Sequence, residues 1–166
     1  MKLALASLAA VLIAAPAAFA QGDVELGAGY SHIDLGPAEV GALTGRGSYF
    51  FSRHFGIEGE ASIGVKDDNV GLGKVELDHS FGAFGVLRAP VTERFDIFGR
   101  VGYATSQLSA SAPGLGSVSE DFDGVAYGVG AKFFVTERVG IRGDFTKYEG
   151  DDNDADVISV GAVIRF

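Results

Sequence analysis

The chain has 166 residues, no cysteine and a formal net charge of −9. Without cysteine it forms no disulfide, thiolate metal site or cysteine nucleophile. Its acidic balance argues against binding to nucleic acid, which requires a basic face.

The N-terminal segment has the features of a cleaved signal peptide. Lys2 provides a positive n-region, residues 3–15 are continuously apolar, and residues 18–20 read Ala-Phe-Ala, an A-x-A cleavage site. Neither this stretch nor any later one reaches the roughly twenty apolar residues of a transmembrane helix. We therefore expect residues 1–20 to be a signal peptide and residues 21–166 to be one mature domain, which would cross a membrane only by strands.

The mature chain contains eight segments in which apolar and polar residues alternate. They cover residues 23–33, 40–51, 55–66, 74–89, 95–107, 123–135, 139–148 and 156–166. A period of two predicts β-strands, because successive side chains of a strand point to opposite faces. The third segment is the clearest, with Phe55, Ile57 and Ile63 set against Glu58 and Glu60. The chain is thus predicted to be all-β.

The last strand ends on an aromatic residue. One face carries Ile158, Val160, Ala162, Ile164 and Phe166, and we assign Asp156, Ser159, Gly161, Val163 and Arg165 to the other, where only Val157 interrupts the polar run. We expect this strand to pair with the first one, which would remove both edges of the sheet. Its apolar face would then meet lipid, and Arg165 would point inward.

The connections between the strands are of two kinds. Tight turns are predicted at residues 52–54, 89–94 and 136–138, and longer loops at 66–74, 108–122 and 149–156. The tight turns belong to a weak repeat, FFSRHFGIEGEASIG, PVTERFDIFGRVGYA and FVTERVGIRGDFTKY. Repeated hairpins favour an up-and-down barrel, and short turns at one end with longer loops at the other are typical of outer-membrane barrels.

Alternation alone does not distinguish this barrel from a soluble, lipocalin-like one with an apolar interior. The polar faces are rich in small residues, and their charges are nearly balanced, as an interior requires. The acids are Glu25, Glu58, Glu60, Glu76, Asp78, Asp96 and Asp144, and the bases are Arg46, Lys66, Arg88, Arg100, Lys132, Arg142 and Arg165. An interfacial aromatic girdle would be formed by Phe51, Phe55, Phe95, Phe133, Phe134 and Phe166. We predict an eight-stranded antiparallel up-and-down transmembrane β-barrel.

Three segments carry a resemblance to a known family. FGRVGYA (98–104), AYGVGAKFFVTERVGIRGDFTKY (126–148) and VISVGAVIRF (157–166) resemble small outer-membrane β-barrel proteins, including the OmpA-type transmembrane domain and opacity-type porin-like proteins. The resemblance implies residence in the cell outer membrane among lipids and lipopolysaccharide. It also implies insertion by the outer-membrane assembly machinery, with Phe166 as the assembly signal. We expect no cofactor.

Charged residues near the short turns are predicted to meet inside the barrel. The expected cluster consists of Glu58, Glu60, Arg100, Lys132, Arg142 and Asp144. One interpretation is a structural plug, and the other is a gate whose rearranged salt bridges open a narrow ion path. Eight strands leave an interior just wide enough for side chains, which argues against a wide pore.

Two further patterns are candidates for a catalytic site or a metal site. The histidines are His32, His54 and His79, but neighbours in a strand point to opposite faces, so neither Ser31–His32 nor His79–Ser80 forms a simple hydrolase pair; only His32 and Asp34 could share a face. The acidic run Asp151, Asp152, Asp154 and Asp156 lacks the glycine and later glutamate of an EF-hand. It is interpreted as a solvated loop, with a weak divalent-cation contact to lipopolysaccharide phosphates as the alternative.

The expected function is therefore that of a non-enzymatic integral outer-membrane protein with a structural or surface-interaction role. A small porin-like ion channel is the leading alternative. An adhesin that binds a host or surface ligand through its loops is another.

Overall fold

The structure, a computed structural model, describes residues 23–34, 39–66, 68–70, 73–112, 116–150 and 154–166. Within these ranges only the backbone is described at residues 66, 68–70, 73–77, 108–112 and 116–122. The expected signal peptide and the predicted faces of Lys66, Val75, Glu76 and Leu77 lie outside what is described. In the described part of the chain, no helix is long and apolar enough to cross a membrane.

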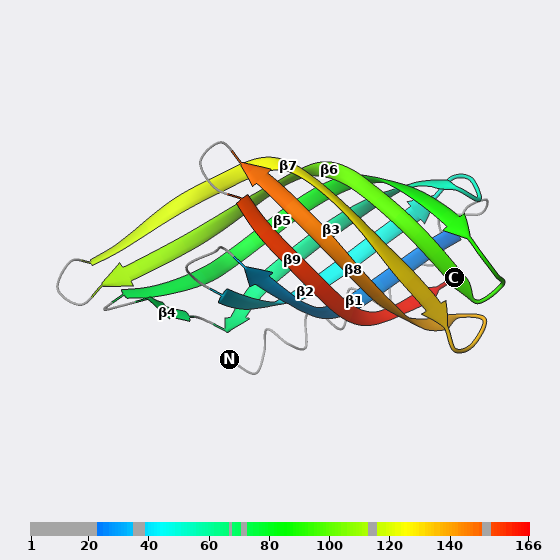
Figure 1. Ribbon diagram of the computed structural model, residues 1–166, viewed down its shortest axis with the longest axis horizontal. Coiled ribbons are helices and arrows are strands. Elements are labelled where there is room, and N and C mark those ends of the chain that lie inside the picture. Colours follow the sequence, from blue (N-terminus) through cyan, green and yellow to red (C-terminus); the bar gives the residue numbers. More distant parts are fainter. Residues whose placement is uncertain (1–22, 35–38, 67, 71–72, 113–115, 151–153) are drawn as a thin grey trace.

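Every regular element of the described chain is a strand. The strands are β1 (Asp23–Asp34), β2 (Glu39–Phe50), β3 (Phe55–Lys66), β4 (Asp68–Val70), β5 (Gly73–Pro90), β6 (Phe95–Ala112), β7 (Gly116–Phe134), β8 (Val139–Gly150) and β9 (Asp154–Arg165). All pairings are antiparallel, and the ring runs β1-β2-β3-β5-β6-β7-β8-β9 and back to β1. The tilted strands wrap around one axis (Figure 1). The predicted eight-stranded antiparallel barrel is confirmed, with β4 as a short addition at the edge of β5.

The first and last strands close the ring, as predicted. β1 and β9 pair from Glu25↔Arg165 to Asp34↔Asp156. At the very end of the chain, the Phe166 N–H donates a hydrogen bond of 2.9 Å to the Val24 carbonyl. Because every ring strand has a neighbour on both sides, the backbone groups within the ring are satisfied by the protein itself.

The repeated turns share one hydrogen-bond pattern. The hydroxyl of Ser52 accepts the N–H of Phe55 at 2.9 Å, and that of Thr136 accepts the N–H of Val139 at 2.9 Å. In the third turn Thr92 Oγ1 accepts the Arg94 N–H at 3.2 Å. A Ser or Thr hydroxyl that binds a backbone N–H two or three residues on stabilises a turn. The sequence repeat therefore reflects three copies of one tight turn.

The other end differs from the predicted long loops. Residues 108–122, expected to be a polar loop, belong largely to β6 and β7, which remain paired as far as Ala112↔Gly116. Residues 68–70, also expected in a loop, form β4 against β5. β5, β6 and β7 are thus the long strands, and they project as a ribbon well beyond their neighbours (Figure 1). The prediction was wrong because it recognised strands only by the alternation of apolar and polar residues. A ribbon in water needs only backbone pairing and can lack that alternation.

Most large apolar side chains point outward and most charged ones inward. On β3, Ile57 is 58% exposed whereas the adjacent Glu58 is 3% exposed, and β8 and β9 show the same alternation of exposed and buried residues. Three assignments are corrected. Phe134 is 1% exposed and lies inside rather than in the girdle. Asp156 is exposed and Val157 is buried, because the even-numbered residues of β9 face outward and the odd-numbered ones face the lumen. Asp78 is exposed because a register shift between Leu77 and His79 interrupts the alternation.

Inward-facing glycines let this narrow barrel coil tightly. A Cβ placed on Gly29 would lie 2.4 Å from the Val160 carbonyl oxygen, and one on its partner Gly161 would lie 2.4 Å from the Ala28 carbonyl oxygen. These contacts are with backbone, which cannot rotate away. Glycine is therefore needed at the β1–β9 seam.

We expect Gly29→Ala to destabilise the barrel by about 1–3 kcal/mol through overpacking. Gly59→Ala is the matched control, since a Cβ there meets no atom within 4 Å. Urea unfolding of the refolded proteins, followed by the different gel migration of boiled and unboiled samples, measures the difference. Equal midpoints for the two variants would contradict the tight seam.

Candidate functional site: the charged lumen

A glutamate of β3 holds two arginines from distant strands. The Glu58 carboxylate accepts hydrogen bonds from Arg142 at 2.5 and 3.0 Å, from Arg100 at 3.0 Å and from the Ser48 hydroxyl at 2.7 Å. Arg142 lies on β8, which is four places from β3 in the eight-membered ring, on the opposite wall. This ion pair therefore crosses the full width of the lumen.

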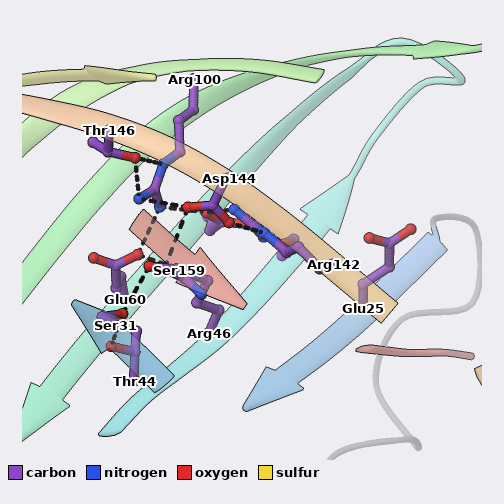
Figure 2. A network of polar contacts seen from close by, with 12 residues as sticks. Glu25, Ser31, Thr44, Arg46, Glu60, Arg100, Arg142, Asp144, Thr146 and Ser159 are labelled. Atoms are coloured by element: carbon purple, nitrogen blue, oxygen red, sulfur yellow. Dashed lines mark hydrogen bonds and ion pairs between the residues drawn. The ribbon is translucent and has the colours of Figure 1, made fainter. Parts of the chain in front are cut away.

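A second glutamate and one aspartate extend the same arrangement. Glu60 accepts from Arg46 and from Arg100 at 2.6 Å each, and from the Tyr148 hydroxyl at 2.8 Å. Asp144 accepts from Arg142 at 2.7 Å. Figure 2 shows Arg46, Arg100 and Arg142 converging on the carboxylates from different strands. We call Arg46, Glu58, Glu60, Arg100, Arg142 and Asp144 the central network.

The central network is electrically neutral, with three arginines and three carboxylates. Its charged side chains are at most 8% exposed. Among the described buried side chains, only Asp144 Oδ2 lacks a hydrogen bond, and it lies 3.5 Å from both Arg46 Nη2 and Arg100 Nη2. Removing one partner from such a buried set leaves an uncompensated charge, which is strongly unfavourable.

A chain of hydroxyl groups lies beside the network. Ser31 Oγ is 2.7 Å from both Thr44 Oγ1 and Ser159 Oγ, and Thr44 Oγ1 is 2.9 Å from Ser62 Oγ. Arg46 joins this chain to the network by donating to Ser159 Oγ at 3.0 Å. Hydroxyls both donate and accept, so the chain satisfies itself without charge.

Contrary to the prediction, Lys132 lies outside the central network. It binds Glu25, which also accepts from Arg88 at 3.0 Å and from Arg165 at 3.1 Å. Lys132 lies directly opposite Arg142 in the β7–β8 pairing. Like charges that face each other across a ladder repel, and these two cations bind carboxylates in different layers.

The Glu25 group forms a second neutral cluster near the short turns. Asp96 accepts from Arg165 at 2.7 Å, and Asp23 from Arg88 at 2.8 Å. Arg165 thus points inward, as predicted. Arg88, Asp96 and Arg165 also line an open depression of about 440 Å³ at this end. We call Asp23, Glu25, Arg88, Asp96, Lys132 and Arg165 the turn-end cluster.

Buried phenylalanines pack among these charges. Phe98 lies 4.4 Å from the Arg142 guanidinium and 5.1 Å from Lys132 Nζ, so it separates the two clusters. Phe50 lies 3.9 Å from Arg88, and Phe134 lies 3.9 Å from Arg165. Cation–π contacts strengthen when water is excluded. The sequence analysis did not predict this packing, although these phenylalanines occupy the inward-facing positions of the alternating pattern.

The other sequence candidates lie at the ends of the barrel. His32 Nε2 is 3.7 Å from Glu39, His79 packs against Phe81, and His54 lies in an exposed turn. Asp154 pairs with Lys147 at 3.3 Å and Asp156 is exposed. Asp151 and Asp152 lie outside the described residues. In the part of the chain that is described, no group of three or more His, Asp or Glu is arranged to hold a metal ion.

Comparison with known proteins gives one family. Residues 3–166 match the family described as outer membrane protein beta-barrel domain. No curated protein matches the chain. Ail, the attachment invasion locus protein of Yersinia pestis, is 21% identical, with a TM-score of 0.65 over 88% of this chain and 99% of that one. It has also been solved with the heparin analogue sucrose octasulfate.

A second structure supports the same fold. The N-terminal β-barrel domain of Pseudomonas aeruginosa OprF is 14% identical, with a TM-score of 0.70 over 88% of this chain and 100% of that one. At these identities the likeness concerns the fold alone.

We expect Arg142→Met to destabilise the barrel by about 3–5 kcal/mol, because Glu58 and Asp144 would be left partly uncompensated in the lumen. Lys147→Met is the control, since its ion pair with Asp154 is largely exposed and is therefore screened by solvent. Unfolding in urea, monitored by far-UV circular dichroism, measures the stability of both variants. A loss for Arg142→Met no larger than that of the control would contradict a tightly coupled network.

Proposed function

Because the chain belongs to the family of outer membrane protein β-barrel domains, and so resides in the cell outer membrane, we propose that it is a non-enzymatic barrel with a closed lumen. Its role is structural and surface-interactive. The short turns face the periplasm and the long strands reach outside, as is general for such barrels. The observation that carries the proposal is the neutral central network, whose ion pairs join opposite walls of the lumen.

The outer surface suits a lipid environment at both ends. Phe51, Phe55, Phe133 and Phe166 are exposed near the short turns, and Tyr30, Tyr103 and Tyr127 near the other end. The Tyr127 hydroxyl donates to Glu149 at 2.6 Å, and that of Tyr103 donates to Asp123. Aromatic residues of this kind favour the membrane–water interface. They support contact with outer-membrane lipids and lipopolysaccharide.

The strongly acidic end of the chain bears on its surface partners. The segments 34–39, 66–78, 120–123 and 147–156 contain 14 acidic residues and three lysines. Their described strand residues, such as Asp34, Asp123 and Glu149, lie at the end opposite the short turns. This charge opposes an anionic ligand such as the sucrose octasulfate bound by Ail. A surface ligand of this chain should therefore be cationic or neutral.

The histidines support the non-enzymatic assignment. His32 faces a glutamate and His79 faces a phenylalanine ring. A hydrolase needs a nucleophile, a base and an orienting group within hydrogen-bond reach of one another. The neighbours of these two histidines differ from that set.

We expect the refolded protein to give no discrete current steps in a planar bilayer, because the central network crosses the lumen. The double variant Glu58→Ser with Arg142→Ser removes a matched pair of charges and should produce steps by opening a path. Wild-type conductance that is altered by Arg100→Ala would instead support the porin-like alternative and reject the closed lumen.

We expect deletion of Phe166 to reduce outer-membrane assembly several-fold, since Phe166 is proposed as the signal read by the assembly machinery. It also removes the closing hydrogen bond to Val24. Phe166→Tyr is the control, because it keeps an aromatic ring and the same backbone. Heat-modifiable protein in membrane fractions is the measure, and equal amounts for deletion and control would refute the signal.

A further inference from the structure

The lumen opens at the short turns into a depression of about 440 Å³. Its wall includes the β2–β3 turn, the β5–β6 turn and the ends of β1 and β9. Its floor is filled, because Arg88 and Arg165 both bind Glu25 there. The turn-end cluster therefore closes the depression toward the lumen, and a ligand can enter it from the side of the short turns.

Two residues that border this depression carry opposite charges. Arg53 lies in the β2–β3 turn and Glu93 in the β5–β6 turn, and both are exposed. Within the described chain, neither side chain takes part in a hydrogen bond or an ion pair, so the two do not bind each other. Opposite charges that border one depression without contact leave space for a ligand that carries both charges.

Further hydrogen-bond donors face the same depression. Arg165 binds its carboxylate partners through Nε and Nη2, which leaves the two N–H groups of Nη1 without an acceptor in the described chain. Thr92 Oγ1 accepts the Arg94 N–H, and its own proton remains to be donated. Together with the Arg53 guanidinium, these groups bring donors from three elements to one depression. Guanidinium groups in particular match the oxygens of phosphate and carboxylate.

The charges that line the depression are balanced. They are Arg53, Arg88 and Arg165 against Asp23, Glu93 and Asp96. A site with no net charge favours neither a simple anion nor a simple cation, whereas separated charges of both signs are complementary to a zwitterion. A phosphate group also accepts hydrogen bonds on several oxygens around one centre, so it can use all three donor groups.

We propose that this depression binds a phosphoethanolamine group, with Arg53, Thr92 and Arg165 holding the phosphate and Glu93 holding the ammonium. The site goes beyond the proposed structural role and rests on its closed lumen, because the turn-end cluster supplies the floor. Phosphoethanolamine occurs both as the headgroup of phosphatidylethanolamine and as a free solute. The recognised chemistry is the same in both.

The test measures binding to the full mature chain refolded in maltoside micelles. Free phosphoethanolamine is compared by calorimetry with phosphocholine, whose quaternary ammonium has no N–H, and with inorganic phosphate, which has no ammonium. We expect phosphoethanolamine to bind about tenfold more tightly than either. The reason is that it alone of the three can donate to Glu93 while its phosphate is held by the arginines.

Variants of the two turns separate the two halves of the ligand. Arg53→Gln should weaken phosphoethanolamine binding about tenfold, because it removes a charge that holds the phosphate. Glu93→Gln should instead abolish the preference for phosphoethanolamine over phosphocholine. Arg138→Gln and Glu137→Gln are matched controls, since these exposed residues of the β7–β8 turn do not border the depression. Both controls should stay within about twofold of wild type, and gel migration checks that every variant folds.

A second arm distinguishes a lipid headgroup from a free solute. Dihexanoyl phosphatidylethanolamine and dihexanoyl phosphatidylcholine are titrated into the same micelles. If the first lipid binds about tenfold more tightly than free phosphoethanolamine, the ligand is the headgroup, and Pro90 and the exposed Val91 are placed to contact its glycerol and chains. Equal affinity assigns the free solute.

Three results would overturn the inference. They are the absence of saturable binding by phosphoethanolamine, equal affinity for Arg53→Gln and Arg138→Gln, and a preference for phosphoethanolamine that survives Glu93→Gln. Bilayer recordings on the same samples separate this inference from the proposed function. A silent barrel that does not bind phosphoethanolamine rejects the ligand site alone, whereas current steps from the wild-type protein reject the closed lumen.

Discussion

The absence of water inside a lipid bilayer is the constraint on which this structure depends. A strand in lipid must have its backbone N–H and C=O groups satisfied by other strands, so the sheet has to close. Pairing of β1 with β9 achieves this closure, and the Phe166 N–H completes it at the last residue. Glycines such as Gly29 and Gly161 let the backbones approach closely at that seam.

Closure with eight strands makes the interior narrow, and a narrow interior has to be packed. Here it is packed with ion pairs and with the phenylalanines that lie between them. Each of the two clusters is neutral, and Phe98 separates them. Because ion pairs such as Glu58–Arg142 join opposite walls, the same contacts that stabilise the barrel also fill its cross-section. Stability and closure of the lumen therefore have one physical origin.

Beyond the membrane the constraint no longer applies. Water can satisfy backbone groups there, so β5, β6 and β7 continue as a ribbon and β7 keeps an open edge. Acidic residues such as Asp34, Asp123 and Glu149 lie at this same end. An edge that would be intolerable in lipid can therefore persist at this end.

The sequence by itself determined the strands, their outward faces and the closure, because a period of two is a local property that each segment carries. It also predicted a balance of charges in the lumen, although Asp78 of the predicted set lies outside. Only the tertiary structure decided that Lys132 binds Glu25, that Phe134 packs under Arg165, and that residues 108–122 extend the ribbon. Which charges meet depends on the tilt and register of strands far apart in the chain, and alternation within one strand contains no information about either.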